Sequence, residues 1–498
     1  MTTPALGWAR VYAINTVGLN KAKELLVVRD PLRAIVIGLF LAMCACLLWR
    51  PFWSHDTWWH IQCGRLIVQD HIWPSPDRFT CTVNGQPWLV HSWISQCVMY
   101  LADRILGDIG LQILDTGTRL LFVFPVWFVT RQSPIPPTIR LLVVANAAFF
   151  CATLEYRPHL AVPVFLTCLV FADDLNRPDC PVPLWTVPLM ALWSTVHPSI
   201  LLGEFLLGVS LLRRWFQPAG ARSARDLLVL SAALLAGFLN PYHFRLVPFS
   251  LFENRGYGQV HINEWLSPLS QLPASSIDLL VLSVNTIIFL WLLARFLKDR
   301  SAYQFHDLIY LAGLCVLACA AYIAFRFMFL STIALLPLLR SFGTRDDPDQ
   351  QCSLLFRPSI PVALLVVYFL ILTVGKPVYS RDWFELKKAT AFLKSVHAEG
   401  NIFNDFSFGG RIIYDCYPNL KVFADGRIGP FEDKVFGQYR EVLEGPEQNA
   451  LAILDDYRID WILIQESLQP RWMNETAGFQ EMYRYSGIVI LKLTGEAN

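Results

Sequence analysis

The sequence predicts a polytopic α-helical membrane protein with a small α/β domain at its C-terminal end. Its 498 residues are 54% hydrophobic and only 16% charged, whereas an ordinary soluble domain carries about 25% charged residues. Apolar runs of about 20 residues, the length that crosses a bilayer, recur between residues 34 and 376. After residue 376 lysines become frequent and the apolar runs become shorter, which indicates a separate soluble domain.

The apolar runs predict about eleven membrane-spanning helices. Their approximate bounds are 34–50, 110–129, 139–154, 159–173, 183–196, 199–213, 226–240, 277–296, 307–324, 326–340 and 359–376. The segment HSWISQCVMYLADRIL (91–106) is short and polar, so we expect it to lie as a helix in the membrane interface. If this segment crosses the bilayer instead, the number of spans rises to twelve.

These helices divide the chain into three parts. Residues 1–33 form a polar, basic N-terminal segment, and residues 34–376 form the membrane domain, whose long outer loop covers residues 51–109. Residues 377–498 form the α/β domain. Its short apolar stretches predict four buried strands: NIFND (401–405), KVFA (421–424), IDWILI (459–464) and GIVILKL (487–493).

The distribution of Lys and Arg predicts the orientation of the chain in the membrane. If the N-terminus is cytoplasmic, these residues are more frequent in the inner segments than in the outer loops, as the positive-inside rule requires. An odd number of spans then places the α/β domain outside the cell. We therefore expect a multi-pass protein of the cytoplasmic membrane. The net charge of +1 gives no indication of a nucleic-acid partner.

Residues that can carry chemistry gather on the outer side of this topology. Nine of the ten histidines fall there, all except His306. Arg157 and Arg326 lie at membrane edges, where a cation is costly unless it has a partner. The outer segments that supply such residues are SHDTWWHI (54–61), EYRPH (155–159), HPS (197–199), NPYH (240–243) and INEW (262–265). A random placement would scatter these residues, so their common location predicts a functional site.

Structural roles for the same residues stay open at this point. Asp56 could cap the helix that follows it, and Glu155 could form a purely structural pair with Arg157. The outer tryptophans could belong to an aromatic belt at the membrane surface. His197 and His243 could cap helix ends.

Two segments carry a resemblance to a known family. HDTWWHIQCGRLIVQDHIWPSPDRFTCTVNGQPWLVHSWISQ (55–96) resembles the first outer loop of uncharacterised bacterial membrane proteins related to the GT-C glycosyltransferase superfamily. NDFSFGGRIIYDCYPNLKVFADGR (404–427) resembles the tail of the same group. The matching residues are Asp56, Trp59, His60, Gly64, Pro74, Asp77, Trp88, His91, Gly409, Gly410, Asp425, Gly426 and Arg427. The likeness covers most of the chain, is loose in the spans, and rests partly on architecture.

The resemblance implies a GT-C-like fold and an enzyme that takes a sugar from a polyprenyl-phosphate carrier in the bacterial inner membrane. GT-C enzymes use an acidic residue of the first outer loop, which here would be Asp56, as general base or as ligand of a divalent ion. Glu155 or Glu264 would be a second acid. Arg157, Arg326 and His159 would bind the donor phosphate. The residues expected to bind substrate are Trp58, Trp59, His91, His197, His243 and Arg427.

The resemblance leaves the metal open. A Mg²⁺ or Mn²⁺ ion would be held by Asp56 together with His55 and His60. However, many GT-C enzymes pair acidic residues in this loop, whereas here His55 and Thr57 flank Asp56. The site could therefore be metal-free.

The partners expected for such an enzyme are a lipid-linked sugar donor, a glycan, lipid or protein acceptor, and the membrane. Other functions remain open. The chain could be a lipid or polysaccharide transporter, for which Arg119 is the one candidate intramembrane charge, or a non-catalytic subunit of a cell-envelope assembly machine. It could also be a degenerate enzyme fold that acts as a binding scaffold through residues 377–498.

Overall fold

The computed structural model describes most of the chain after residue 53. The described residues are 54–133, 135–173, 180–219, 222–253, 263–273, 275–298, 304–342, 382–427, 431, 433–475 and 478–494. The predicted N-terminal segment 1–33 and the predicted spans 34–50 and 359–376 lie outside them. All described residues belong to one compact unit, Arg50–Asn498.

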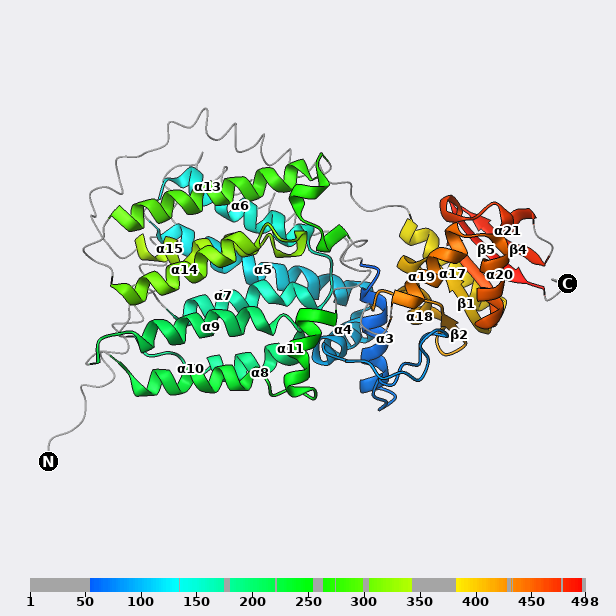
Figure 1. Cartoon of the computed structure of the whole chain (residues 1–498), viewed down its shortest axis with the longest axis horizontal. Coiled ribbons are helices and arrows are strands. Elements are labelled where there is room, and N and C mark those ends of the chain that lie inside the picture. Colours follow the sequence, from blue (N-terminus) through cyan, green and yellow to red (C-terminus); the bar gives the residue numbers. More distant parts are fainter. Residues whose placement is uncertain are drawn as a thin grey trace. The chain divides into compact units, whose positions relative to one another are not determined.

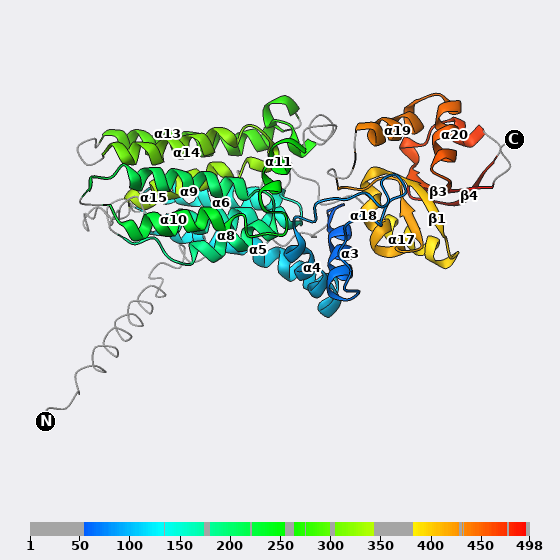
Figure 2. The ribbon, with the colours of Figure 1, turned by 60° about the horizontal axis from the view of Figure 1, so that its bottom comes forward.

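The part of the chain that was predicted to form the membrane domain is built from apolar helices of different lengths that lie side by side (Figures 1 and 2). Their bounds are α5 Asp108–Gln132, α6 Pro137–Thr153, α7 Val162–Ala172, α8 Thr186–Val196, α9 Ile200–Trp215, α10 Ala224–Ala236, α13 Ser276–Lys298, α14 Phe305–Ala320 and α15 Leu330–Phe342. Each overlaps one predicted span between 110–129 and 326–340. The sequence therefore located these helices correctly, because each coincides with a predominantly apolar stretch.

Two of these helices are long and apolar enough to cross a bilayer by length and composition, at Asp108–Arg131 and Ser276–Lys298. The other apolar helices that the structure describes are shorter; α8, for example, has 11 residues and is about 16 Å long. The number of about eleven spans therefore stays a prediction.

The outer surface of the long helices is suited to lipid. On α5, Leu121 and Phe124 are 61% and 60% exposed, and on α13 Ile287 is 66% exposed. Large apolar side chains in such positions would be unfavourable in water. Polar groups lie inside instead, where the amide of Asn285 bonds Asn146 of α6 and Ser331 of α15. Such buried polar contacts hold helices together where lipid supplies no hydrophobic driving force.

The predicted outer loop forms two helices, α3 Thr57–Val68 and α4 Trp93–Leu106, that pack on each other. The close packing requires a glycine, because a side chain at Gly64 would collide with the backbone of Gln96 on α4. The segment 91–106 is thus helical as expected. The exposed apolar side chains at its end, Ile105 and Leu106, suit the interfacial position that the sequence predicts.

The C-terminal domain is a five-stranded sheet covered by helices. The strands are β1 Gly400–Asn404, β2 Leu420–Val422, β3 Ile459–Gln465, β4 Phe479–Tyr485 and β5 Ile488–Leu493, in the order β2-β1-β3-β5-β4. β1 runs parallel to β2 and β3, and β5 runs antiparallel to β3 and β4. The helices are α17 Asp382–Ser395, α18 Gly409–Cys416, α19 Asp433–Glu444, α20 Glu447–Asp456 and the short α21 Trp472–Glu475.

The four predicted strands are confirmed as β1, β2, β3 and β5, and β4 was not predicted. β4 is an edge strand with the sequence FQEMYRY and no fully buried residue. It therefore lacks the apolar run that marks the other strands.

The outer loop and the C-terminal domain share one hydrophobic core. Trp59 and Leu66 of α3 pack in the same cluster as Ile402 of β1 and Leu463 of β3. The loop also extends the sheet, since Val422 donates to the carbonyl of Phe79 and its own carbonyl accepts from the amide of Cys81. This shared core brings the C-terminal domain to the N-terminal end of α3, where Asp56 lies.

Candidate active site

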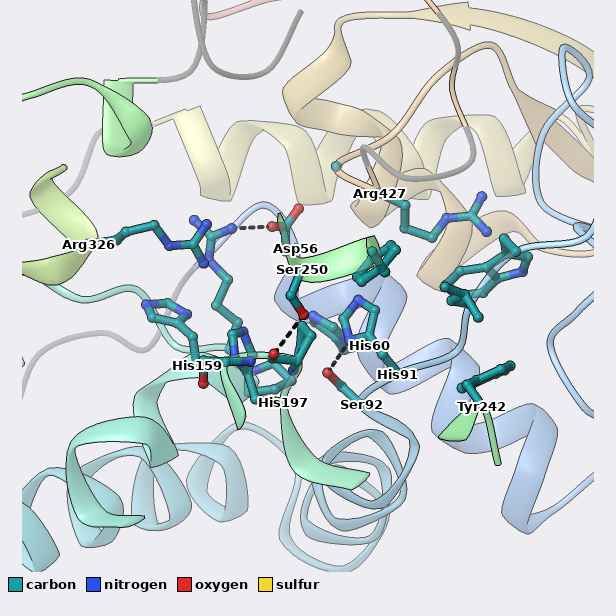
Figure 3. A pocket seen from close by; sticks show the side chains of 18 of the residues that line it. Asp56, His60, His91, Ser92, His159, His197, Tyr242, Ser250, Arg326 and Arg427 are labelled. Atoms are coloured by element: carbon teal, nitrogen blue, oxygen red, sulfur yellow. Dashed lines mark hydrogen bonds and ion pairs between the residues drawn. The ribbon is translucent and has the colours of Figure 1, made fainter. Parts of the chain in front are cut away.

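A cavity of about 620 Å³ lies where the outer segments meet (Figure 3). It is bounded by the start of α3, the loop before α4, the segments that precede α7 and α9, and residues 426–427 of the C-terminal domain. The predicted site residues that line it are Asp56, Trp59, His60, His91, Arg157, His159, His197, Glu264, Arg326 and Arg427. The fold therefore brings together most of the residues that the outer clustering pointed to.

Asp56 occupies the N-cap position of α3, yet its side chain makes no capping hydrogen bond. One carboxylate oxygen, Oδ2, is 2.5 Å from the Nη1 atom of Arg157. The other, Oδ1, accepts a hydrogen bond of 3.2 Å from the indole of Trp59. The capping role left open by the sequence is thus not the role this side chain has.

Arg157 is the centre of the charged end of the cavity. Its extended backbone precedes the 3₁₀ turn η1 Pro158–Ala161 and directs the side chain toward Asp56. Besides Asp56, its guanidinium contacts Glu155 at 2.9 Å and Glu264 at 2.6 Å. Three carboxylates from separate segments therefore converge on one arginine.

Arg326 stands on the other side of Glu264. Its Nη1 atom is 3.6 Å from Glu264 Oε1, and its guanidinium lies 4.1 Å from the ring centroid of Trp265. Arg157 and Arg326 both pair with Glu264, and both side chains line the cavity. The two guanidinium groups share this site with the carboxylates of Asp56, Glu155 and Glu264, so an anionic group would bind through N–H groups that these carboxylates do not occupy.

Several hydrogen-bond donors of this end have no partner within the described part of the chain. They are Arg157 Nε, Trp265 Nε1 and the ring nitrogen Nδ1 of His159. Buried polar groups are normally paired, and exceptions require an explanation. All three side chains line the same cavity, so a ligand with several acceptor oxygens, such as a phosphate group, would satisfy them.

Histidine rings form one wall of the cavity. The ring centroids of His91 and His197 are 6.4 Å apart, and those of His159 and His197 are 6.2 Å apart. His60 contacts Gln96 at 3.2 Å through Nδ1. Burial lowers the pKa of His91 to about 4 and that of His60 and His197 well below the ordinary value. These rings are neutral near pH 7 and can bond hydroxyl groups without adding charge.

Burial and charge also shift the pKa of the ionic groups. Burial raises the pKa of Asp56 to about 6, against the opposing effect of Arg157. Burial alone would lower the pKa of Arg157, but its three carboxylate partners raise it above the ordinary value. Asp56 is therefore ionised at neutral pH and can take up a proton close to that pH, as a general base must.

Some predicted site residues lie outside the cavity. Trp58 is buried under the guanidinium of Arg411, 4.1 Å from its ring centroid, and serves the contact with the C-terminal domain. His243 is exposed on a backbone with φ of 48°. Glu155 does not line the cavity and holds Arg157 from behind, where it also accepts a hydrogen bond from Ser54.

The residues expected to hold a divalent metal ion do not form a ligand set. His55 is exposed, and His60 is directed to Gln96. Among the residues that the structure describes, no three His, Cys, Asp or Glu side chains are grouped as metal ligands. The carboxylates that could serve, Asp56 and Glu264, both face the guanidinium of Arg157. The positive charge that lies between these two carboxylates is the Arg157 side chain.

Arg427 lines the cavity, but its charge is already neutralised. It pairs with Asp425 at 2.7 Å and with Asp77 at 2.7 Å, and only 3% of the residue is exposed. Its guanidinium also lies against the rings of Phe79 and Trp88. These contacts connect the C-terminal domain to the outer loop.

The site also includes residues that the sequence reasoning did not single out. Trp265 follows Glu264 in the INEW segment, and Tyr242 precedes His243, so both stood beside predicted residues. Arg245 lines the cavity mouth and is exposed. The only signal in the sequence that could have pointed to Arg245 is its position two residues after the NPYH segment (240–243).

Comparison with known proteins supports the architecture. No protein-family model matches the chain, and no curated protein matches it by sequence. The oligosaccharyltransferase of Archaeoglobus fulgidus in its apo form is similar in structure, with a TM-score of 0.55 and 11% identity over 89% of this chain and 70% of that one. The Archaeoglobus fulgidus enzyme AglB in complex with an inhibitory peptide and a dolichol-phosphate gives a TM-score of 0.51 at 11% identity, covering 88% and 70%.

A second enzyme has the same architecture. ArnT from Cupriavidus metallidurans in the apo state gives a TM-score of 0.52 at 12% identity, over 92% of this chain and 97% of that one. Identities this low establish the fold alone. The chain thus shares its fold with the Archaeoglobus fulgidus oligosaccharyltransferase and with ArnT.

Proposed function

We propose that the protein is an integral membrane glycosyltransferase that moves a sugar from a polyprenyl-phosphate-linked donor to an acceptor at the outer face of the membrane. The observation that carries the proposal is the charged end of the cavity. There a carboxylate with a raised pKa, two guanidinium groups and three donors that have no partner among the described residues face one space. The GT-C fold supports the same conclusion, since the AglB structure named above holds a dolichol-phosphate.

In the proposed reaction the acceptor hydroxyl attacks the anomeric carbon of the donor sugar. The bond between that carbon and the phosphate oxygen breaks, and the electron pair stays on the phosphate. Asp56 receives the hydroxyl proton as general base. Arg157, Arg326 and His159 stabilise the charge that grows on the departing phosphate, which is the main catalytic task in such a transfer. The convergence of three carboxylates on Arg157 supports a site whose fixed cation is supplied by the chain.

Neutral rings on the opposite wall are suited to the sugar. His91 and His197 can bond its hydroxyl groups, and the adjacent Trp59 and Trp88 offer apolar faces. The acceptor, whether glycan, lipid or protein, would enter from the extracytoplasmic side. We place the protein in a bacterial inner membrane with its N-terminus in the cytoplasm and its α/β domain outside, as the charge distribution predicts.

The transporter alternative draws no support from Arg119. This side chain pairs with Asp115 one turn away at 2.7 Å and also bonds the carbonyls of Cys151 and Leu154. It fixes α5 to the end of α6 and is not among the residues that line the cavity around Asp56. A transport site near the midplane would need groups that can exchange partners.

The test is sugar transfer by the purified protein in liposomes. The donors are a radiolabelled hexose on polyprenyl monophosphate and on polyprenyl diphosphate, offered with extracted cell-envelope acceptors. Asp56→Ala should lower the transfer rate by about 10³-fold, whereas Asp70→Ala, an exposed acid just after α3, should match wild type. Full activity in a folded Asp56→Ala variant would refute the mechanism. Lipid flux without any transfer product would favour the transporter.

A further inference from the structure

The loop Asp425-Gly426-Arg427 of the C-terminal domain lies directly against the carboxylate of Asp56. The loop follows β2 and is fixed from both sides. Arg427 bonds Asp425 through Nε at 2.9 Å and pairs with Asp77 of the outer loop at 2.7 Å. Asp425 is fully buried. The loop is therefore anchored independently of any contact with Asp56.

A side chain at position 426 would force the carboxylate of Asp56 to move. A Cβ atom built there would overlap the Oδ1 atom of Asp56 and lie 2.8 Å from its Cγ atom. The backbone conformation does not demand glycine, because Gly426 is not among the residues with positive φ. Glycine is needed at this position because the proposed catalytic carboxylate, Asp56, occupies the space that a side chain would take.

Asp56 is thus held from three directions. Arg157 of the membrane domain pairs with Oδ2, Trp59 of α3 donates to Oδ1, and Gly426 closes the remaining side. A second glycine repeats the arrangement one residue earlier, since a Cβ atom at Gly410 of α18 would overlap the carbonyl oxygen of His55. Two glycines of the tail thus let the C-terminal domain approach the start of α3.

We propose that the Asp425-Gly426-Arg427 loop is a positioning element for Asp56, through which the C-terminal domain sets the place of that carboxylate relative to Arg157. The inference rests on the proposed function for its catalytic meaning, although the contact itself can be tested without any sugar transfer. Gly426 acts through Asp56 and is a positioning residue.

The first test is a double-mutant cycle on thermal unfolding of the full chain in detergent. Gly426→Ala should lower the unfolding midpoint, because the methyl group displaces the carboxylate from Arg157. In the Asp56→Ala background the same change should have no effect, since the conflicting oxygen is gone. Gly437→Ala on α19 is the matched control, because nothing lies within 4 Å of its Cβ position. Equal loss in both backgrounds would overturn the proposal.

The second test follows the carboxylate itself. Carbodiimides modify protonated buried carboxyl groups, so the extent of labelling at Asp56, read by mass spectrometry against pH, reports its protonation. The charged groups that act on Asp56 are Arg157, Arg326, Glu155 and Glu264. Arg157 is the cation in direct contact with Asp56, so moving Asp56 away from it weakens the ionised form, and the labelling midpoint of Gly426→Ala should rise by about one pH unit. A midpoint equal to that of wild type and Gly437→Ala would contradict the proposal.

The two proposals fail separately. If Gly426→Ala does not fold, recovery of folding in the Asp56→Ala, Gly426→Ala double variant supports the positioning contact, and failure to recover overturns it. If wild type transfers no sugar from either lipid donor, the proposed function fails, while the unfolding cycle and the labelling still decide whether the loop positions Asp56.

Discussion

Two buried charge clusters lie at opposite ends of α9, and they differ in what surrounds them. At the start of the helix, Leu201 and Leu202 line the cavity that holds Asp56, Arg157 and Glu264. At its end, about 18 Å away, Arg213 and Arg214 form ion pairs with three aspartates. Asp173 contacts both arginines at 3.1 Å, Asp307 contacts Arg213 at 3.1 Å and Asp226 contacts Arg214 at 2.7 Å.

Both clusters consist of buried ion pairs between arginines and carboxylates, but they serve different purposes. The aspartates of the second cluster come from the end of α7, the start of α10 and the start of α14, so its ion pairs fasten four helices together. None of its five side chains is among the residues lining the described cavity. The comparison teaches that buried charge alone does not mark an active site. The distinguishing feature is the adjoining cavity, which the side chains of the first cluster line and those of the second cluster do not.

The largest expected effect is the loss of transfer activity when Arg157, the central cation of the cavity cluster, is replaced. Arg157→Gln leaves Asp56, Glu155 and Glu264 without their common cation, so the transfer rate at saturating donor should fall by about 10³-fold. Arg225→Gln is the control, because that side chain is half-exposed, pairs only at the edge of the second cluster and lies far from the cavity. A rate within tenfold of wild type for Arg157→Gln would show that the two clusters do not differ as described.

A substitution in the second cluster should lower the stability of the protein and leave its transfer activity unchanged. Asp173→Asn removes the carboxylate that both Arg213 and Arg214 share, and breaking a buried ion pair costs about 3–5 kcal/mol. The free energy of unfolding in mild detergent measures the loss. The transfer rate per folded molecule should equal that of wild type. A loss of activity without a loss of stability would assign the second cluster a functional part.

The pH dependence of kcat/KM should be determined by Asp56 of the cavity cluster and not by the second cluster. Asp56 must be ionised to accept a proton, and burial raises its pKa to about 6. Its ionised fraction therefore falls as the pH drops below 6, so kcat/KM should decrease about tenfold per pH unit there and stay level above pH 7. The Asp173→Asn variant should keep the same profile. An acid limb that begins near pH 4 would mean that a different group is titrated.

The smallest expected effect concerns the donors that have no partner. His159→Ala removes one hydrogen bond to the proposed phosphate group, which is worth about 1.5 kcal/mol, or roughly tenfold in the KM for the lipid donor. The kcat should fall as well, because the same hydrogen bond stabilises the charge that grows on the departing phosphate. His243→Ala, exposed and outside the cavity, should change neither value. An unchanged KM for His159→Ala would remove this residue from the phosphate site.

The elements of the molecule could largely be predicted from sequence, because each depends on residues close together in the chain. The helices from α5 to α15 follow apolar runs, and β1, β3 and β5 follow short buried stretches. β4 was missed because an edge strand needs few buried residues, and its pairing with β5 supplies what its own sequence lacks. The outer clustering of histidines and acids also depended only on where the spans begin and end.

The composition of the site depended on tertiary contacts. Arg157 meets residues 101 and 107 positions away in the chain, and no local pattern states that three carboxylates will share one guanidinium. Trp58 and Trp59 are adjacent in sequence, yet successive helical residues point in different directions. One therefore packs under Arg411 while the other lines the cavity. The sequence pointed to the residues near Asp56, but it did not show which of them form ion pairs or hydrogen bonds with one another.

The sequence by itself determined the membrane class, the helices and the side on which chemistry was expected, because hydrophobicity and charge act locally and accumulate along each segment. Only the tertiary structure decided that Arg157 is the cation at the site and that Gly426 closes against Asp56. The physical reason is that short-range overlap and ion pairing depend on distances of a few ångströms between distant segments. Those distances are set by the packing of α3 against the C-terminal domain.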